Sequence, residues 1–162
     1  MSDDRRGQHQ KFLERLDASR PSIFRVAEWL HKRGYSVSIP AIQYAPTAKE
    51  HLKYVDHGDI VIEKNGKKGL VEVKHMIKRN FTCAADHKRD DILLSNVNAV
   101  KRLINRVTAY VIVNQTMTHV AVIYSNTKEH WFEKKVFAKN TQNYEMFMAC
   151  PIKFVEFRCI NE

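Results

Sequence analysis

The chain has 162 residues, of which 44% are hydrophobic and 28% are charged, and it contains only five Gly and four Pro. These values are typical of one ordinary globular domain, and they exclude disordered and fibrous classes. Lys and Arg outnumber Asp and Glu by 27 to 18, which gives a formal net charge of +9. This charge favours a nucleic acid as the partner, because neutralising phosphates releases counterions, while acidic proteins and anionic membranes stay open as alternatives.

The N-terminus and the cysteines indicate the cellular location. The first residues, MSDDRRGQHQKF, are too polar for a signal peptide, and no apolar run approaches the ~20 residues that span a bilayer. We therefore expect no membrane association and a cytoplasmic location. Cys83, Cys150 and Cys159 are odd in number and widely spaced, so we expect reduced thiols. They include no CxxC pair to indicate a structural zinc site, and the set His75, Cys83 and His87 matches no common zinc module.

Two helices are predicted at the start of the chain. Residues 8–16 could form a short helix, and residues 19–34 form a stronger one. In the second helix Ser19 can cap the N-terminus and Pro21 suits the first turn. One face of it carries an apolar stripe at helical spacing, formed by Ile23, Val26, Ala27 and Leu30.

A strand and a hairpin follow the second helix, which we expect Gly34 to end. The alternating residues 35–39 predict the strand, and residues 41–54 form a loop that leads to the hairpin. In the hairpin, two apolar runs flank the pair Asn65-Gly66. Asn-Gly is the strongest short signal for a type I′ turn.

The Asn-Gly turn fixes which residues of the hairpin face each other. A type I′ turn at this place pairs residues whose numbers sum to 131, so Asp59 falls opposite Glu72. Strand alternation puts Lys74 on the same face as Glu72. The other face of the hairpin is apolar and is expected to be buried; it carries Ile60, Ile62, Val71 and Val73.

The rest of the chain contains one more predicted helix and several strands. In chain order we expect a basic loop at 75–89, a helix from Asp90 or Asp91 to about 106, strands at 107–113 and 119–124 around a turn at 114–118, an ambiguous element at 130–137 and a strand at 152–160. No repeat or composition break marks a second domain. The sequence therefore predicts a single α/β domain over residues 1–162, with one mixed sheet flanked by helices.

Two carboxylates that face each other need a physical explanation, because opposed like charges destabilise a sheet. One of Asp59 and Glu72 could be protonated, Lys74 could neutralise the pair, or both could be solvated at a frayed hairpin end. A hard divalent cation between them is the sharper hypothesis. Mg²⁺ is commonly held by one or two carboxylates together with water and substrate phosphate oxygens.

This pattern resembles the PD-(D/E)XK nuclease superfamily, whose members share the restriction-endonuclease-like fold. Asp59 precedes an apolar strand, and Glu72-Val73-Lys74 ends the next strand. The order of the neighbouring helices and strands also fits, so the resemblance covers residues 19–113, and residues 114–162 form a C-terminal extension. It implies a restriction-endonuclease-like mixed β-sheet core and a metal-dependent deoxyribonuclease.

The resemblance also assigns roles to residues. Asp59 and Glu72 would bind Mg²⁺ or Mn²⁺, with the main-chain carbonyl of Val73 as a further ligand, and Lys74 would position or activate the attacking water. Many members add an acidic residue from the first helix, for which Glu28 is the candidate and Glu14 a weaker one. The sequence departs from the pattern at Gly58, where the family motif has Pro, and Asp56 competes with Asp59 for the metal.

Of the basic residues around the hairpin, those that follow the proposed catalytic lysine are candidates for binding the substrate backbone. Lys67 and Lys68 lie at the turn, and Phe81 could stack on a base. The aromatic residues Trp29, Trp131, Tyr144, Phe147, Phe154 and Phe157 are interpreted as core or oligomer contacts. After the proposed catalytic lysine, the candidate substrate-binding residues are His75, Lys78, Arg79, Lys88 and Arg89.

The predicted function is hydrolysis of phosphodiester bonds in DNA by a magnesium-dependent endonuclease or exonuclease, with DNA favoured over RNA. Compact members of the family often act on branched DNA or serve in restriction and phage DNA metabolism, and many are dimers, which leaves a homodimer open. The alternative is a non-catalytic module that keeps the nuclease fold and binds nucleic acid or another protein.

Overall fold

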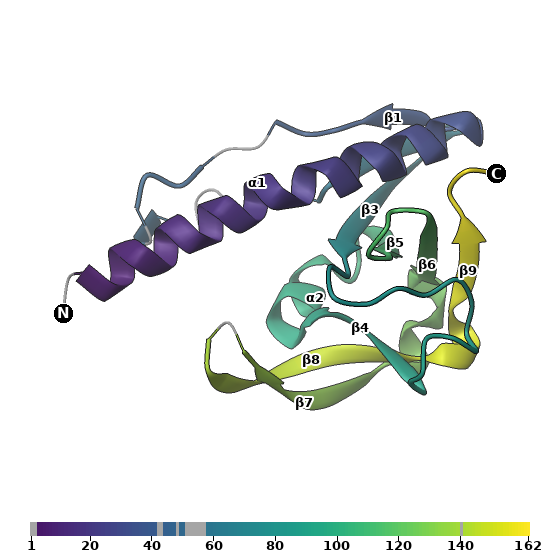
Figure 1. Ribbon diagram of the computed structural model, residues 1–162. Coiled ribbons are helices and arrows are strands. Elements are labelled where there is room, and N and C mark those ends of the chain that lie inside the picture. The colour runs from purple at the N-terminus through teal and green to yellow at the C-terminus, as the bar shows by residue number, and fades with distance from the viewer. Residues whose placement is uncertain (1–2, 42–43, 48, 51–57, 140) are drawn as a thin grey trace.

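The computed structural model describes residues 3–41, 44–47, 49–50, 58–139 and 141–162 (Figure 1). No helix in these ranges is both long and apolar enough to cross a membrane. In chain order the elements are α1 (Asp3–Lys32), β1 (Ser36–Ser38), β2 (Ile60–Lys64), β3 (Lys67–His75), β4 (Asp91–Asn96), α2 (Val97–Leu103), β5 (Val107–Val113), β6 (His119–Tyr124), the 3-10 helix η2 (Ser125–His130), β7 (Phe132–Ala138), β8 (Asn143–Pro151), the 3-10 helix η3 (Ile152–Phe154) and β9 (Glu156–Cys159).

Two sheets form the body of the protein. Within the described residues, six strands make a mixed sheet in the order β1-β2-β3-β5-β6-β9, and three strands make an antiparallel sheet in the order β4-β8-β7. The β3 and β5 strands pair in parallel, joined by a crossover through β4 and α2. The predicted mixed α/β sheet with flanking helices is confirmed, whereas the second sheet was not predicted.

The first helix is continuous, so the predicted break before Ser19 is wrong. Pro21 lies inside α1 on its exposed side. The hydroxyl groups of Ser19 and Ser22 donate hydrogen bonds back to the carbonyl oxygens of Leu16 and Ser19, each at 2.7 Å. A proline removes one main-chain donor, and burial of the turns that follow it outweighs that loss. The predicted end is confirmed, since Gly34 adopts φ +84° just after the helix.

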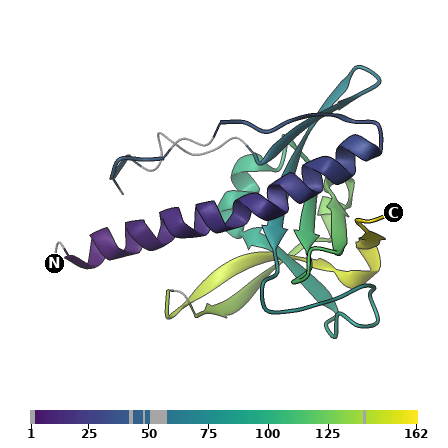
Figure 2. The ribbon, with the colours of Figure 1, turned by 45° about the horizontal axis from the view of Figure 1, so that its top comes forward.

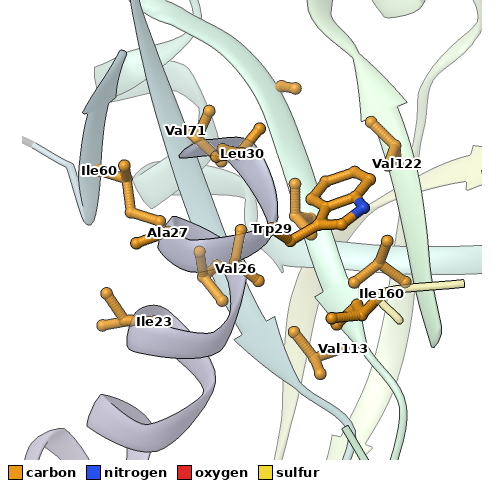
Figure 3. Packing of buried hydrophobic residues seen from close by; sticks show 14 of the residues in the cluster. Ile23, Val26, Ala27, Trp29, Leu30, Ile60, Val71, Val113, Val122 and Ile160 are labelled. Atoms are coloured by element: carbon orange, nitrogen blue, oxygen red, sulfur yellow. The ribbon is translucent and has the colours of Figure 1, made fainter. Parts of the chain in front are cut away.

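One face of the six-stranded sheet packs on the C-terminal half of α1. Figure 3 shows the helix side chains directed at residues of the central strands. Trp29 is only 5% exposed, which confirms its predicted place in the core. The cluster combines Ile23, Val26, Ala27 and Leu30 of the helix with Ile60, Ile62, Val71, Val73, Val111 and Val113 of the sheet.

The opposite face of the six-stranded sheet packs on β4, α2 and β8, so α1 and the second layer lie on opposite sides of it (Figure 2). Residues 91–96 form a strand here, and the predicted helix over 90–106 is reduced to α2. Asn96 caps this helix, and its side chain accepts a hydrogen bond from the amide of Ala99 at 2.8 Å. Residues 91–96 form a strand and not a helix because β4 pairs with β8. In this strand Ile92 and Leu94 face the core.

The C-terminal part of the chain agrees with the prediction in some elements only. The strands predicted at 107–113 and 119–124 are confirmed as β5 and β6. The ambiguous residues 130–137 largely form β7, and the predicted strand at 152–160 is the turn η3 followed by the shorter β9. Tyr144 lies on β8 and is 63% exposed, so it is not part of the core.

Candidate active site

The hairpin of β2 and β3 has the predicted turn and register. Asn65 and Gly66 adopt φ values of 53° and 73°, which the type I′ turn requires. The strands pair Ile60 with Val71 and Lys64 with Lys67, so paired numbers sum to 131 along the whole ladder. This register brings Asp59, directly before β2, to the level of Glu72 on β3.

Asp59 is attached to β3 by its side chain. Its Oδ2 accepts a hydrogen bond from the main-chain amide of Val73 at 2.7 Å. The N–H and C=O groups of one strand residue point to the same edge of that strand. The carbonyl oxygen of Val73 is therefore directed to the edge at which the Asp59 carboxylate lies.

Glu72 is a buried carboxylate in an otherwise apolar layer. It is 7% exposed, and its face of the sheet also carries Leu70, Tyr110 and Ile112. In the parallel register, Tyr110 lies beside Glu72. Burial raises the pKa of the Tyr110 hydroxyl far above its ordinary value, and the negative charge of Glu72 raises it further. A carboxylate buried in such surroundings is typical of functional sites.

Lys74 lies on the same face as Glu72, as strand alternation predicted. It follows Glu72 by two residues on β3, about 7 Å along the strand. Its side chain is half-buried, at the end of β3 that extends beyond Ile60, the first residue of β2. Lys74 is thus the cationic side chain of a group that we call the carboxylate site: Asp59, Glu72 and Lys74.

Gly58 explains why the residue before Asp59 is not proline. Its φ is +118°, whereas the proline ring holds φ near −65°. A Cβ atom at this position would approach Cδ1 of Leu70 to 2.2 Å. The departure from the family motif is therefore required by the path of the chain into β2.

The structure does not bring Glu28 to the carboxylate site. The helix α1 covers the Val71 and Val73 face of the sheet, and Glu72 is on the other face. The carboxylate of Glu28 is exposed and forms ion pairs with Arg25 at 2.9 Å and Lys32 at 2.8 Å. Hydrogen bonds from Lys32 and then Arg25 lower the pKa of Glu28.

The other acidic candidates do not enlarge the carboxylate site. Glu14 is exposed on α1, the helix on the opposite side of the sheet from Glu72. Asp56, the rival for the metal, lies outside the described residues. The acidic residues that the described structure brings together are therefore Asp59 and Glu72.

Only some of the candidate substrate-binding residues lie together in the structure. Lys78, Arg79 and Arg89 line one pocket. Lys88 is exposed and does not line that pocket. The alternation of β3 turns His75 away from the face of Lys74, and its Nε2 lies 3.2 Å from the carbonyl oxygen of Gln115. His75 is therefore not placed for proton transfer at the carboxylate site.

Burial corrects one further expectation, and distance separates two lysines from the site. Phe81 is 1% exposed and packs edge-on against His87 and Phe157, so it cannot stack on a base. Lys67 and Lys68 lie at the hairpin turn, roughly 20 Å along β3 from Lys74. These two lysines cannot contribute to the electrostatics of the carboxylate site.

Sequence reasoning missed two residues that shape the site. Tyr110 was read only as part of a strand, because the parallel register that sets it beside Glu72 depends on the crossover. Asn114, fully buried after β5, was read as part of a turn. Its amide nitrogen donates to Asn80 at 2.6 Å and to the carbonyl of Phe81 at 2.9 Å, which fixes the segment that follows Lys74. Asn114 directly follows the apolar run 107–113 and precedes polar residues, and nothing in the sequence indicates its burial.

The donor set fits a magnesium or manganese ion. Two carboxylates and one main-chain carbonyl supply the hard oxygen ligands that Mg²⁺ prefers, and water and phosphate oxygens usually complete its octahedron. Across the described ranges, no group of three or more His, Cys, Asp or Glu side chains could hold a metal.

Comparison of the chain with protein-family models, with curated proteins and with solved structures finds no match. The functional proposal rests on the residues and their geometry.

Proposed function

We propose that this protein is a metal-dependent deoxyribonuclease with a site of the PD-(D/E)XK type. The observation that carries the proposal is the hairpin register, which sets Asp59 level with Glu72 and places Lys74 on the face of Glu72. The Val73 amide holds the Asp59 side chain against β3 at the same point. Glu72 and Lys74 thus lie on an interior strand of the sheet, with the Asp59 carboxylate bound to it, and regular strands hold catalytic groups more accurately than loops do.

The arrangement of elements supports a restriction-endonuclease-like fold. A helix, three antiparallel strands, a crossover containing a helix and a further strand follow one another from α1 to β5. The strand that carries Glu72 lies inside the mixed sheet and pairs with β2 on one side and β5 on the other. This is the element order on which the resemblance to the nuclease superfamily is based.

The roles of the residues follow from their donor chemistry. Asp59, Glu72 and the Val73 carbonyl would hold Mg²⁺ or Mn²⁺. When bound, such an ion lowers the pKa of water and offsets negative charge that develops on the phosphate. The Lys74 ammonium, which has donors only, would orient the attacking water and stabilise a phosphate oxygen. Water would attack phosphorus, and the bond from phosphorus to one bridging oxygen would break.

Cleavage assays test the catalytic proposal directly. The protein is incubated with plasmid, linear, single-stranded and branched DNA and with RNA, in Mg²⁺, in Mn²⁺ and in a chelator. We expect metal-dependent cleavage, with rates reduced on the order of 100-fold or more in Glu72→Gln and in Lys74→Ala. Matched controls are Glu63→Gln and Lys68→Ala, which change the same residue types near the other end of the hairpin and should keep wild-type rates.

Two outcomes would contradict the catalytic proposal. One is no metal-dependent cleavage of any substrate, and the other is cleavage that persists in both site variants. Circular dichroism of each variant shows whether a loss reflects unfolding. Retained nucleic-acid binding without cleavage would instead support the non-catalytic module, since the net charge of +9 favours nucleic-acid binding in either case.

A further inference from the structure

A positively charged pocket lies between the segment after β3 and the start of β4. Its volume is about 330 Å³, and its cations are Lys78, Arg79 and Arg89, all exposed. Asp91 also lines it, but the Oδ2 atom of that carboxylate is paired with the Lys134 ammonium at 2.5 Å. The pocket therefore has an excess of positive charge and is suited to an anion.

The same pocket has an extensive apolar wall. Two side chains come from the segment after β3 and two from β4: Met76, Ile77, Ile92 and Leu93. Ile92 is 1% exposed and forms part of the core, whereas Ile77 is 63% exposed. A simple phosphate ion would gain nothing from such a wall. Cations beside apolar side chains fit a ligand that carries a phosphate and a flat aromatic ring whose face packs on the apolar wall.

The pocket lies on the same side of the sheet as the carboxylate site. Met76 follows Lys74 by two residues and packs against the cluster that contains Leu70 and Ile92. The backbone separation between Lys74 and Met76 is about 7 Å. A ligand held in the pocket would therefore be a near neighbour of a group held at Lys74.

Hydrogen bonds fix the two segments that form the pocket. The amide of Met76 donates to the carbonyl of Val113 at 2.8 Å, and the amide of Gln115 donates to the carbonyl of Arg79 at 3.0 Å. On the other side of the pocket, His87 Nε2 lies 3.0 Å from the carbonyl oxygen of Asp91. The pocket is thus formed by anchored main chain and not by surface side chains alone.

We propose that this pocket, which we call the nucleotide pocket, binds one unpaired nucleotide of the substrate strand next to the scissile phosphate. Its phosphate contacts the three cations, and its base lies against the apolar wall. The inference rests on the proposed function, which supplies the nucleic acid. A pocket of about 330 Å³ is near the lower end of the usual ligand range, and this size suits one nucleotide. The substrate class is therefore DNA with an unpaired segment at the cleavage point.

Binding without metal tests this inference independently of cleavage. Fluorescence anisotropy in a chelator compares a blunt duplex with a duplex of the same length that has a single-stranded overhang. We expect Arg79→Ala with Arg89→Ala to weaken binding of the overhang duplex about tenfold more than that of the blunt duplex. The matched control, Lys67→Ala with Lys68→Ala, removes the same charge at the hairpin turn and should affect both duplexes equally.

A second variant tests the apolar wall. Ile77→Ser should weaken overhang binding several-fold without changing the dependence of affinity on salt, since it removes no phosphate contact. The double arginine variant should reduce the slope of log K against log salt by about two, one for each cation. Phe24→Ser, an equally exposed apolar position on α1, is the control and should have no effect.

The results that overturn the nucleotide pocket differ from those that overturn the nuclease. Equal losses for blunt and overhang duplexes in the double arginine variant, or wild-type overhang binding in Ile77→Ser, would overturn the pocket. Absence of cleavage with discrimination between the two duplexes intact would overturn the nuclease and leave the pocket standing.

Discussion

At the scale of single residues, Asp86 organises the loop between β3 and β4. Its carboxylate accepts hydrogen bonds from the Thr82 hydroxyl at 2.7 Å, from the Thr82 amide at 2.9 Å and from the Cys83 amide at 3.0 Å. These bonds, with that of the Thr82 hydroxyl the strongest, lower the pKa of Asp86 from its ordinary 3.8 to about 2. The same loop carries His87 and Arg89 of the nucleotide pocket.

A lowered pKa determines how the loop responds to acid. The folded state holds the proton of Asp86 less tightly than the unfolded state does. The contribution of Asp86 to the stability of the folded state is therefore present above pH ~4 and is lost as the pH falls to about 2. We expect the carboxyl carbon of Asp86 to titrate with a midpoint of about 2 in an NMR experiment. In Thr82→Ala the midpoint should rise toward the ordinary value, and an unchanged midpoint would contradict this role of the hydroxyl.

The central site residues could be predicted because hairpin register is a local property. The turn at Asn65 and Gly66 determines the partners of every residue in β2 and β3, so Asp59, Glu72 and Lys74 could be placed from the sequence. Glu28 could not be placed, because its distance from Glu72 depends on which face of the sheet the helix covers. The face of the sheet on which His75 lies follows from strand alternation, but only once β3 is known to extend to residue 75.

At the scale of elements, the entry of the chain into β2 depends on Gly58. Its positive φ and the short distance from an added Cβ to Leu70 both penalise a larger residue. We expect Gly58→Ala to lower the free energy of unfolding by about 3 kcal/mol, from backbone strain and overpacking together. Urea denaturation followed by circular dichroism measures this change.

Gly66→Ala is the matched control for that substitution. Gly66 also has a positive φ, of 73°, but no atom lies within 4 Å of the position of an added Cβ. Gly66→Ala should lower the free energy of unfolding by only about 1 to 2 kcal/mol. Equal losses in the two variants would mean that the contact with Leu70 contributes little.

Elements whose pattern is locally unambiguous were predicted well, and those that depend on distant partners were not. Residues 107–113 and 119–124 are short apolar runs around a turn, and both form strands. The apolar residues of 92–104 also fit a helical period, and the sequence alone favoured a helix. Residues 91–96 become a strand because β8, for example Met148 opposite Ser95, completes a sheet with them.

At the scale of the whole molecule, α1 extends beyond the two sheets. Figures 1 and 2 show its N-terminal half projecting from the body, and residues 44 and 45 lie beside it. The contacts there include Tyr44, whose hydroxyl donates to Asp17 at 2.6 Å, and His9, whose Nε2 lies 3.0 Å from the carbonyl oxygen of Ala45. The C-terminal half is instead packed into the core.

This difference predicts a gradient of hydrogen exchange along one helix. Amides of residues 26–30 should exchange only with global unfolding, whereas those of residues 13–19 should open locally and exchange much faster. Mass spectrometry of deuterated peptides measures both regions in one experiment. Strands β3 and β5 serve as the internal reference for full protection, and equal protection along α1 would contradict the prediction.

The pairing of β4 with β8 has a consequence for synthesis of the chain. A ribosome completes β3 at His75 but finishes β8 only at Pro151, roughly 4 to 15 s later at ordinary rates of translation. Until then the layer that covers Glu72 lacks its central strand, and this carboxylate stays in contact with water. A nascent chain would thus carry Glu72 exposed, and burial of this carboxylate would be among the last events of folding.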